Sequence, residues 1–135
     1  MDLSKASKSV GAFLTIIGAL GVVIIVSDSV LREYAPLHFS ALIVFVLVDF
    51  SLAALVFIKP SKTAFTLAMI WSVLRIALLV GDVAQGVSFN YLFNPFNPVA
   101  DNPPGIPGAV LDLMLIIQII VIPMALRART AYRPH

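Results

Sequence analysis

Two opposite charges lie inside apolar stretches of this chain, where an ionised side chain needs a specific partner. Arg75 stands in WSVLRIALLVGD, and Asp49 stands in the apolar run before it, LIVFVLVDFSLAALVFI. A lone charge at the centre of a bilayer costs about 2.5–3.5 kcal/mol on insertion scales. Two kinds of chemistry fit these residue types. One is a carboxylate–guanidinium ion pair. The other is an ion or proton relay that continues to Asp82.

The depths of the two charges favour the ion pair. At 1.5 Å per helical residue, Arg75 lies roughly 20 Å past Lys62 and Asp49 roughly 15 Å before Lys59. Helical side chains lean toward the N-terminus of their own helix. In two antiparallel helices joined by the KPSK turn, the arginine and the aspartate therefore lean toward each other. We predict that Asp49 and Arg75 pair in the interior of a helical bundle.

The same segment argues for a structural role of the pair over transport. Small residues share one face of this helix with the arginine, which allows close helix packing in lipid. An arginine does not deprotonate in proteins, so an Asp–Arg pair carries protons poorly. Transport through Asp49, Arg75 and Asp82 remains the alternative. The residues on the predicted face are Ala64, Ala68, Ser72, Arg75 and Asp82.

The composition indicates an integral membrane protein, because the chain is too apolar for a soluble domain of its size. Hydrophobic residues make up 60% of the 135 residues and charged residues 12%, with a mean hydropathy of +1.02. Soluble domains have roughly 45–50% apolar and about 25% charged residues. A small domain also has too much surface for its volume to hide so many apolar side chains.

Four stretches are long and apolar enough for membrane spans, which need about 20 residues. They predict an all-α fold, a bundle of four transmembrane helices in a single domain, residues 1–135. Pro60 is expected to end the second helix, and Ser61 to cap the third. The predicted spans are residues 10–30, 38–58, 63–83 and 108–126, and residues 85–107 form a predicted outer loop.

The distribution of basic residues predicts the orientation in the cell membrane. With four spans, only Arg32 falls on the side opposite the termini. Cytoplasmic loops carry the excess of Lys and Arg, so both termini are expected to be cytoplasmic. The basic residues on the predicted cytoplasmic side are Lys5, Lys8, Lys59, Lys62, Arg127, Arg129 and Arg133.

The acidic residues lie mainly toward the outer face. Asp28, Asp82 and Asp112 could hold a cation if they converged, but we favour the simpler interpretation of hydrated helix ends. A negative charge early in a helix also complements the helix dipole. Two histidines and no cysteine make a haem or metal centre unconvincing. No metal and no cofactor are therefore predicted.

The predicted outer loop is rich in proline, asparagine and aromatic residues. Its aromatic side chains suggest contact with the membrane interface or with a protein surface. Loops of this length without secondary structure are usually functional or disordered. We interpret the loop as a docking surface for a partner, with a belt on the lipid headgroups as the alternative. Its aromatic residues are Phe89, Tyr91, Phe93 and Phe96.

Three further features concern helix packing. The first span has a close-packing surface, either inside the bundle or toward another subunit, made of Gly11, Thr15, Gly18 and Val22, with Ala19 and Gly21 nearby. Gln118 is a polar group at depth and is expected to bond a neighbouring helix. Trp71 is too deep for a simple interface anchor and is expected to serve packing.

These observations predict a non-catalytic accessory subunit of a larger membrane complex, for example a respiratory oxidase or a membrane monooxygenase. No phosphate loop, nucleophile elbow or zinc-helix motif is present, so the chain is not expected to be an enzyme by itself. The lipid bilayer and other membrane subunits are the expected partners. Nucleic acid is not, because the basic tail suits lipid headgroups better. The alternative is a small oligomeric transporter or channel for an ion or small solute.

Overall fold

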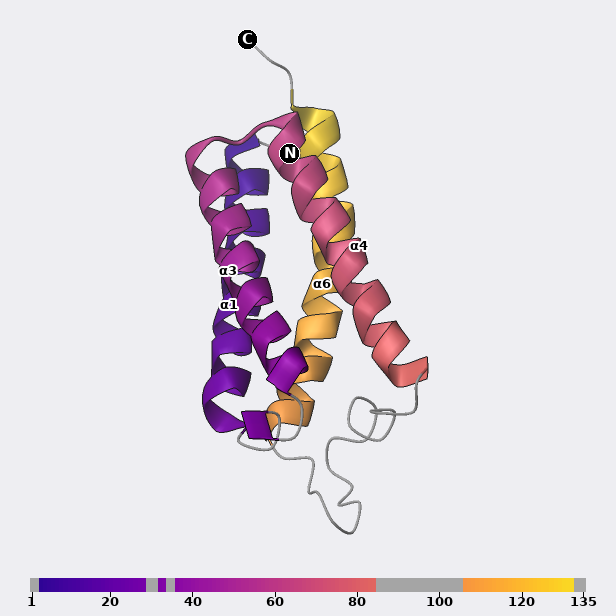
Figure 1. Ribbon diagram of the computed structural model, residues 1–135. Helices are drawn as coiled ribbons and strands as arrows, with labels where there is room; N and C mark the ends of the chain where they lie inside the picture. Colours follow the sequence, from indigo (N-terminus) through magenta and orange to yellow (C-terminus); the bar gives the residue numbers. More distant parts are fainter. Residues whose placement is uncertain (1–2, 29–31, 34–35, 85–105, 133–135) are drawn as a thin grey trace.

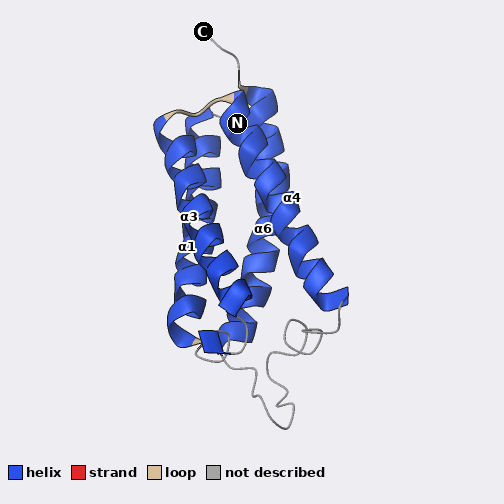
Figure 2. Cartoon of the chain, in the orientation of Figure 1, coloured by secondary structure: helices blue, strands red, loops and turns tan. Residues whose placement is uncertain are grey.

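The chain folds as a bundle of long helices. The computed structural model describes residues 3–28, 32–33, 36–84 and 106–132. Figure 2 shows that the described residues are helical apart from short connections. The long helices in these described residues are α1 (Leu3–Ser27), α3 (Pro36–Ile58), α4 (Lys62–Ala84) and α6 (Ile106–Ala131).

Three of these helices are long and apolar enough to cross a membrane: α1 from Lys5, α3, and α6 from Val110. This composition indicates a membrane location and is compatible with contact with a lipid bilayer. The helix α4 was also expected to be a span, but it is less clearly apolar. Its described part carries Thr63, Thr66 and Ser72 as well as the charged Arg75.

The helices form a ring in the order α3, α1, α6, α4 (Figure 1). The helix α1 packs along both α3 and α6, and α4 packs along α6. In contrast, α3 and α4 touch each other much less, although a short turn joins them. The antiparallel hairpin expected from that turn is therefore present, but its two helices separate beyond it (Figure 1).

The interior of the ring is filled by small and branched apolar residues. Alanines lie where α4 and α6 face the core, which lets these two helices approach closely. The main buried residues are Val10, Leu14, Ile17 and Ile24 of α1, Ala53 and Val56 of α3, Ala64, Phe65 and Ala68 of α4, and Met114, Val121, Ala125 and Ala128 of α6.

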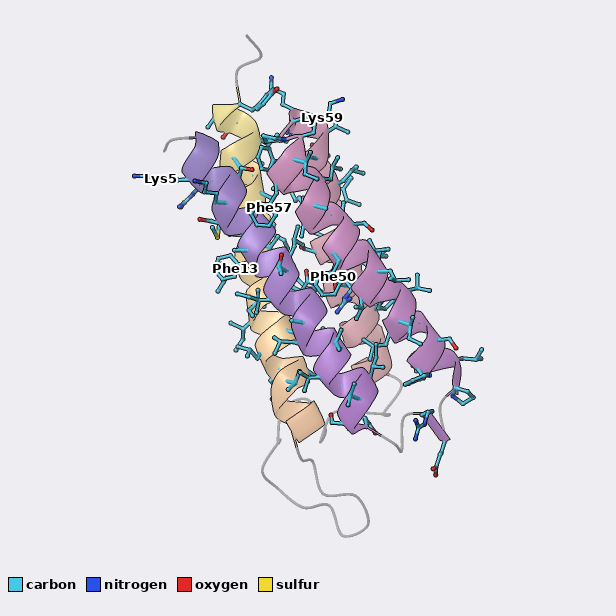
Figure 3. The ribbon with its side chains drawn as sticks, turned by 90° about the vertical axis from the view of Figure 1, so that its left-hand side faces the viewer. Lys5, Phe13, Phe50, Phe57 and Lys59 are labelled. Carbon is cyan, nitrogen blue, oxygen red and sulfur yellow. The ribbon has the colours of Figure 1, made fainter. Side chains whose placement is uncertain are left out.

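The glycines of α1 face α3, so they serve packing within the bundle. A Cβ added at Gly11 would lie 2.7 Å from the ring of Phe57, and one at Gly18 would lie 3.0 Å from the ring of Phe50. Figure 3 shows these two rings in place where α1 and α3 face each other. Each glycine thus makes room for a phenylalanine of the neighbouring helix.

The turn between α3 and α4 is capped on both sides. The Ala64 amide donates to Ser61 Oγ at 3.1 Å, so the cap predicted at Ser61 is confirmed. Pro60 has no amide hydrogen and cannot donate to the carbonyl of Val56 one turn earlier. Ser7 Oγ of α1 donates to that carbonyl at 2.6 Å. A side chain from another helix therefore replaces the donor that the proline removes.

Six of the seven exposed Lys and Arg residues in the described part of the chain lie at one end of the bundle. The turn and both termini lie at this end (Figure 1), where Lys5 and Lys59 are labelled in Figure 3. Among the described residues, Asp28, Arg32, Glu33 and Asp112 lie toward the opposite end. The cations at the first end are Lys5, Lys8, Lys59, Lys62, Arg127 and Arg129, and all six are exposed.

Candidate functional site

The two charges in the apolar stretches lie together inside the bundle. Arg75 Nη1 of α4 donates to Asp49 Oδ2 of α3 at 3.0 Å. Asp49 is 0% exposed and Arg75 is 4% exposed. Their helices contact each other little elsewhere, so this bond is a principal connection between α3 and α4.

The second oxygen of the Asp49 carboxylate accepts a hydrogen bond from Trp71. Its indole Nε1 donates to Asp49 Oδ1 at 2.7 Å. Trp71 and Arg75 are four residues apart on α4 and therefore project from the same face of that helix. One carboxylate of α3 thus accepts hydrogen bonds from two successive turns of α4, which fixes the depth and the rotation of one helix against the other.

Phe45 completes the cluster from α3. Its ring meets the indole of Trp71 edge to face, with centroids 5.4 Å apart at 81°, a favoured aromatic geometry. The guanidinium carbon of Arg75 lies 5.0 Å from the centroid of the same ring, within the range of a cation–π interaction. Asp49 and Phe45 are also one turn apart, so two turns of α3 meet two turns of α4.

We call Asp49, Arg75 and Trp71 the clamp, because hydrogen bonds between these side chains connect α3 and α4. Removing two charges from water is costly, and their attraction offsets that cost only when the geometry is good and the remaining polar atoms are bonded. Here both carboxylate oxygens have donors. Breaking a buried pair by removing one partner typically costs about 3–5 kcal/mol. The pair therefore makes the assembled bundle strongly dependent on both residues.

Two further polar side chains lie in the interior of the bundle. Ser72 of α4 and Gln118 of α6 are each 0% exposed. Ser72 Oγ and both amide atoms of Gln118 find no hydrogen-bond partner among the described residues. Gln118 was expected to bond a neighbouring helix, and in that respect the prediction was wrong.

The acidic residues predicted as a possible cation site do not form a described cluster. In the described part of the chain, no three His, Cys, Asp or Glu side chains group in a way that could hold a metal ion. Asp28 follows the end of α1, and Asp112 is half-buried on α6. Asp82 belongs to α4, but its side chain lies outside the described residues. The relay through Asp82 therefore stays a prediction.

The aromatic residues predicted to form the docking surface all lie in the segment 85–105. This segment is outside the described residues. The docking role of Phe89, Tyr91, Phe93 and Phe96 therefore stays a prediction.

Sequence reasoning missed the role of Trp71, and it did not single out Phe45. The signal for Trp71 was available: it precedes Arg75 by one helical turn and was noted as too deep for an interface anchor. An indole N–H at that depth needs an acceptor, and the nearest predicted acceptor was Asp49. Nothing in the sequence pointed to Phe45, because its run contains many large apolar residues.

Comparison of the chain with protein-family models, with curated proteins and with solved structures gives no match.

Proposed function

We propose that this protein is a non-catalytic accessory subunit of a larger membrane complex and acts as a rigid helical scaffold within it. The observation that carries this proposal is the clamp of Asp49, Arg75 and Trp71. Both oxygens of the buried carboxylate are occupied by donors from one neighbouring helix. A carboxylate held in this way shapes the bundle and is poorly placed for acid–base chemistry.

The outer surface of the bundle supports the same function. Large apolar side chains are exposed on all four helices, including Leu47 of α3 and Ile70 of α4. Acyl chains or the helices of other membrane subunits can cover such side chains without an energetic penalty. The helix α4 also exposes Val73 and Leu74.

In the proposed topology all four helices cross the membrane and both termini are cytoplasmic. The six exposed cations at the end that carries the termini support this orientation, because cytoplasmic ends are rich in Lys and Arg. The clamp explains how α4 can cross despite its polar residues: Arg75 is paired, and Ser72 faces the interior. The helices of 23–26 residues are about 35–39 Å long, enough for a hydrocarbon core of about 30 Å.

The topology is testable because the chain contains no cysteine. Single cysteines at Thr63 and Thr130 mark the basic end, and one at Ser27 marks the other end. All three sites are exposed. In intact cells, a membrane-impermeant maleimide is expected to label Ser27→Cys but not Thr63→Cys or Thr130→Cys, which should react only after the membrane is opened. Labelling of Thr63→Cys in intact cells would show that the orientation is the opposite of the proposed one. Different accessibility of Thr63→Cys and Thr130→Cys would exclude a spanning α4.

The accessory function is tested by extracting the protein from its native membrane in a mild detergent and measuring mass and composition by native mass spectrometry. We expect one complex with different subunits in fixed stoichiometry. The variant Arg75→Leu is expected to be lost from that complex, whereas Lys62→Leu, which removes an exposed cation from the same helix, should remain in it. A wild-type chain recovered alone or as a homo-oligomer would contradict the proposal.

Transport is the second candidate, and the polar interior favours it. Ser72 and Gln118 place unpartnered hydrogen-bonding atoms in the buried interior, which also holds the ion pair. In the proposed transport function, Asp49, Arg75 and Asp82 line the path of an ion or a small solute. A homo-oligomer that conducts ions after reconstitution into liposomes, and loses conduction in Asp82→Asn, would favour this candidate.

A further inference from the structure

Ser72 and Gln118 place polar atoms without hydrogen-bond partners in the interior of the bundle. An unpaired polar group in a membrane interior costs several kcal/mol, because neither lipid nor bulk water satisfies it. Three of their atoms have no partner among the described side chains and backbone. Since both residues are 0% exposed, a helix from another subunit cannot reach them from outside. The missing partners must therefore lie inside the bundle.

The two side chains lie at similar depth on helices that pack along each other. Ser72 is about 15 Å along α4 from Lys62, and Gln118 is about 20 Å along α6 from Ala131, by the helical rise. The starting points of both distances lie at the same end of the bundle (Figure 1). Both side chains are buried, and α4 and α6 pack along each other.

We infer that Ser72 and Gln118 form an internal water-binding site between α4 and α6. A hydroxyl and a carboxamide can each donate and accept, so together they match a neutral ligand that also does both. The buried charges of Asp49 and Arg75 satisfy each other, so they leave no net charge in the interior to attract an ion. A buried water typically makes about three hydrogen bonds, and the two side chains offer these.

The test uses the wild-type protein in lipid nanodiscs, with nitrogen-15 in glutamine side chains. The chain has two glutamines, Gln85 and Gln118, so two carboxamide signals are expected. The variants Gln85→Asn and Gln118→Leu assign them, and either variant alone is sufficient. A rotating-frame Overhauser experiment then measures cross-peaks from water to the Gln118 side-chain amide. Dipolar contact and chemical exchange give cross-peaks of opposite sign, and the inference requires the sign of dipolar contact.

We expect a water cross-peak at the Gln118 amide in the wild type and a weaker cross-peak of the same sign in Ser72→Ala, where both amide atoms of Gln118 remain to hold the water. Persistence in Ser72→Ala is required because the Ser72 hydroxyl proton exchanges with water and could mimic it. Absence of the cross-peak in the wild type would overturn the inference. So would its loss in Ser72→Ala, because the hydroxyl and not a bound water would then have carried the signal. The accessory function proposed above stands or falls independently of this result.

Discussion

Arg75→Leu is expected to reduce the amount of folded protein far more than the double replacement of Asp49→Asn with Arg75→Gln. The single variant leaves the Asp49 carboxylate in a fully buried position with Trp71 as its remaining donor. Removing one partner from a buried pair costs about 3–5 kcal/mol, chiefly because the other charge stays behind without compensation. The double variant removes both charges and keeps groups that can donate and accept.

The double variant also preserves the contact with the indole. An asparagine at position 49 retains an oxygen that can accept from Trp71 Nε1, which now donates to Oδ1 at 2.7 Å. A glutamine at position 75 can donate across the same interface, although it is shorter than arginine. We therefore expect the free energy of unfolding to fall much less in the double variant than in Arg75→Leu.

The measurement is the free energy of unfolding in lipid or detergent, followed by the fluorescence of Trp71, the single tryptophan of the chain. Asp49→Asn, Arg75→Gln and their combination form a double-mutant cycle that isolates the coupling between positions 49 and 75. Lys62→Leu is the matched control, because it exchanges an exposed cation of the same helix for leucine. Equal losses in Arg75→Leu and in the double variant would show that the pair does not connect α3 and α4.

The helix pattern was predictable because it depends on local composition. Four apolar stretches predicted four helices, and each stretch is overlapped by a long helix in the described part of the chain. Three of these helices are clearly apolar enough to span a membrane. The bounds differ most at two ends: α1 begins at Leu3 and α6 continues to Ala131. A helix does not stop where its apolar stretch ends, so the predicted ranges omitted the turns that carry Lys5, Lys8 and Arg129.

The candidate site was predictable only where its geometry follows the helical rise. Depth along two antiparallel helices brings Asp49 and Arg75 to the same level, and the structure places their polar atoms 3.0 Å apart. The rotation of each helix about its own axis cannot be derived from the helical rise. It decides that the indole of Trp71 meets the carboxylate, and that Gln118 faces an interior without a protein partner.

Contacts between distant segments escaped the sequence for a related reason. Pro60 predicts a carbonyl without its helical donor, but no local rule predicts that Ser7 of another helix supplies the hydrogen bond. The short turn before α4 predicted close neighbours, yet α3 and α4 are the least packed adjacent pair. The side chains of Phe45, Trp71 and Arg75 meet between them, and the distance between packed helices depends on the size of the side chains at their contact.

Gly21→Ala is expected to destabilise the bundle by about 1–3 kcal/mol, the usual effect of an added methyl group in a packed core. The new Cβ would clash with Cγ2 of Val46 on α3. Val46 is 6% exposed and β-branched, so its side chain has few alternative rotamers in a helix. The two helices must then move apart along the interface that α1 and α3 share.

Gly11→Ala is the matched comparison and is expected to cost much less. Its Cβ would meet the end of the Phe57 ring at 2.7 Å, but that ring is 46% exposed and can turn toward the lipid. Val46→Ala should rescue Gly21→Ala, because it removes the methyl group that causes the clash. We therefore expect the pair at positions 21 and 46 to be strongly non-additive, whereas Val46→Ala leaves the effect of Gly11→Ala unchanged. Thermal unfolding of the five variants in one detergent measures this. Similar losses for Gly21→Ala and Gly11→Ala, or no rescue by Val46→Ala, would show that the glycines do not set the distance between α1 and α3.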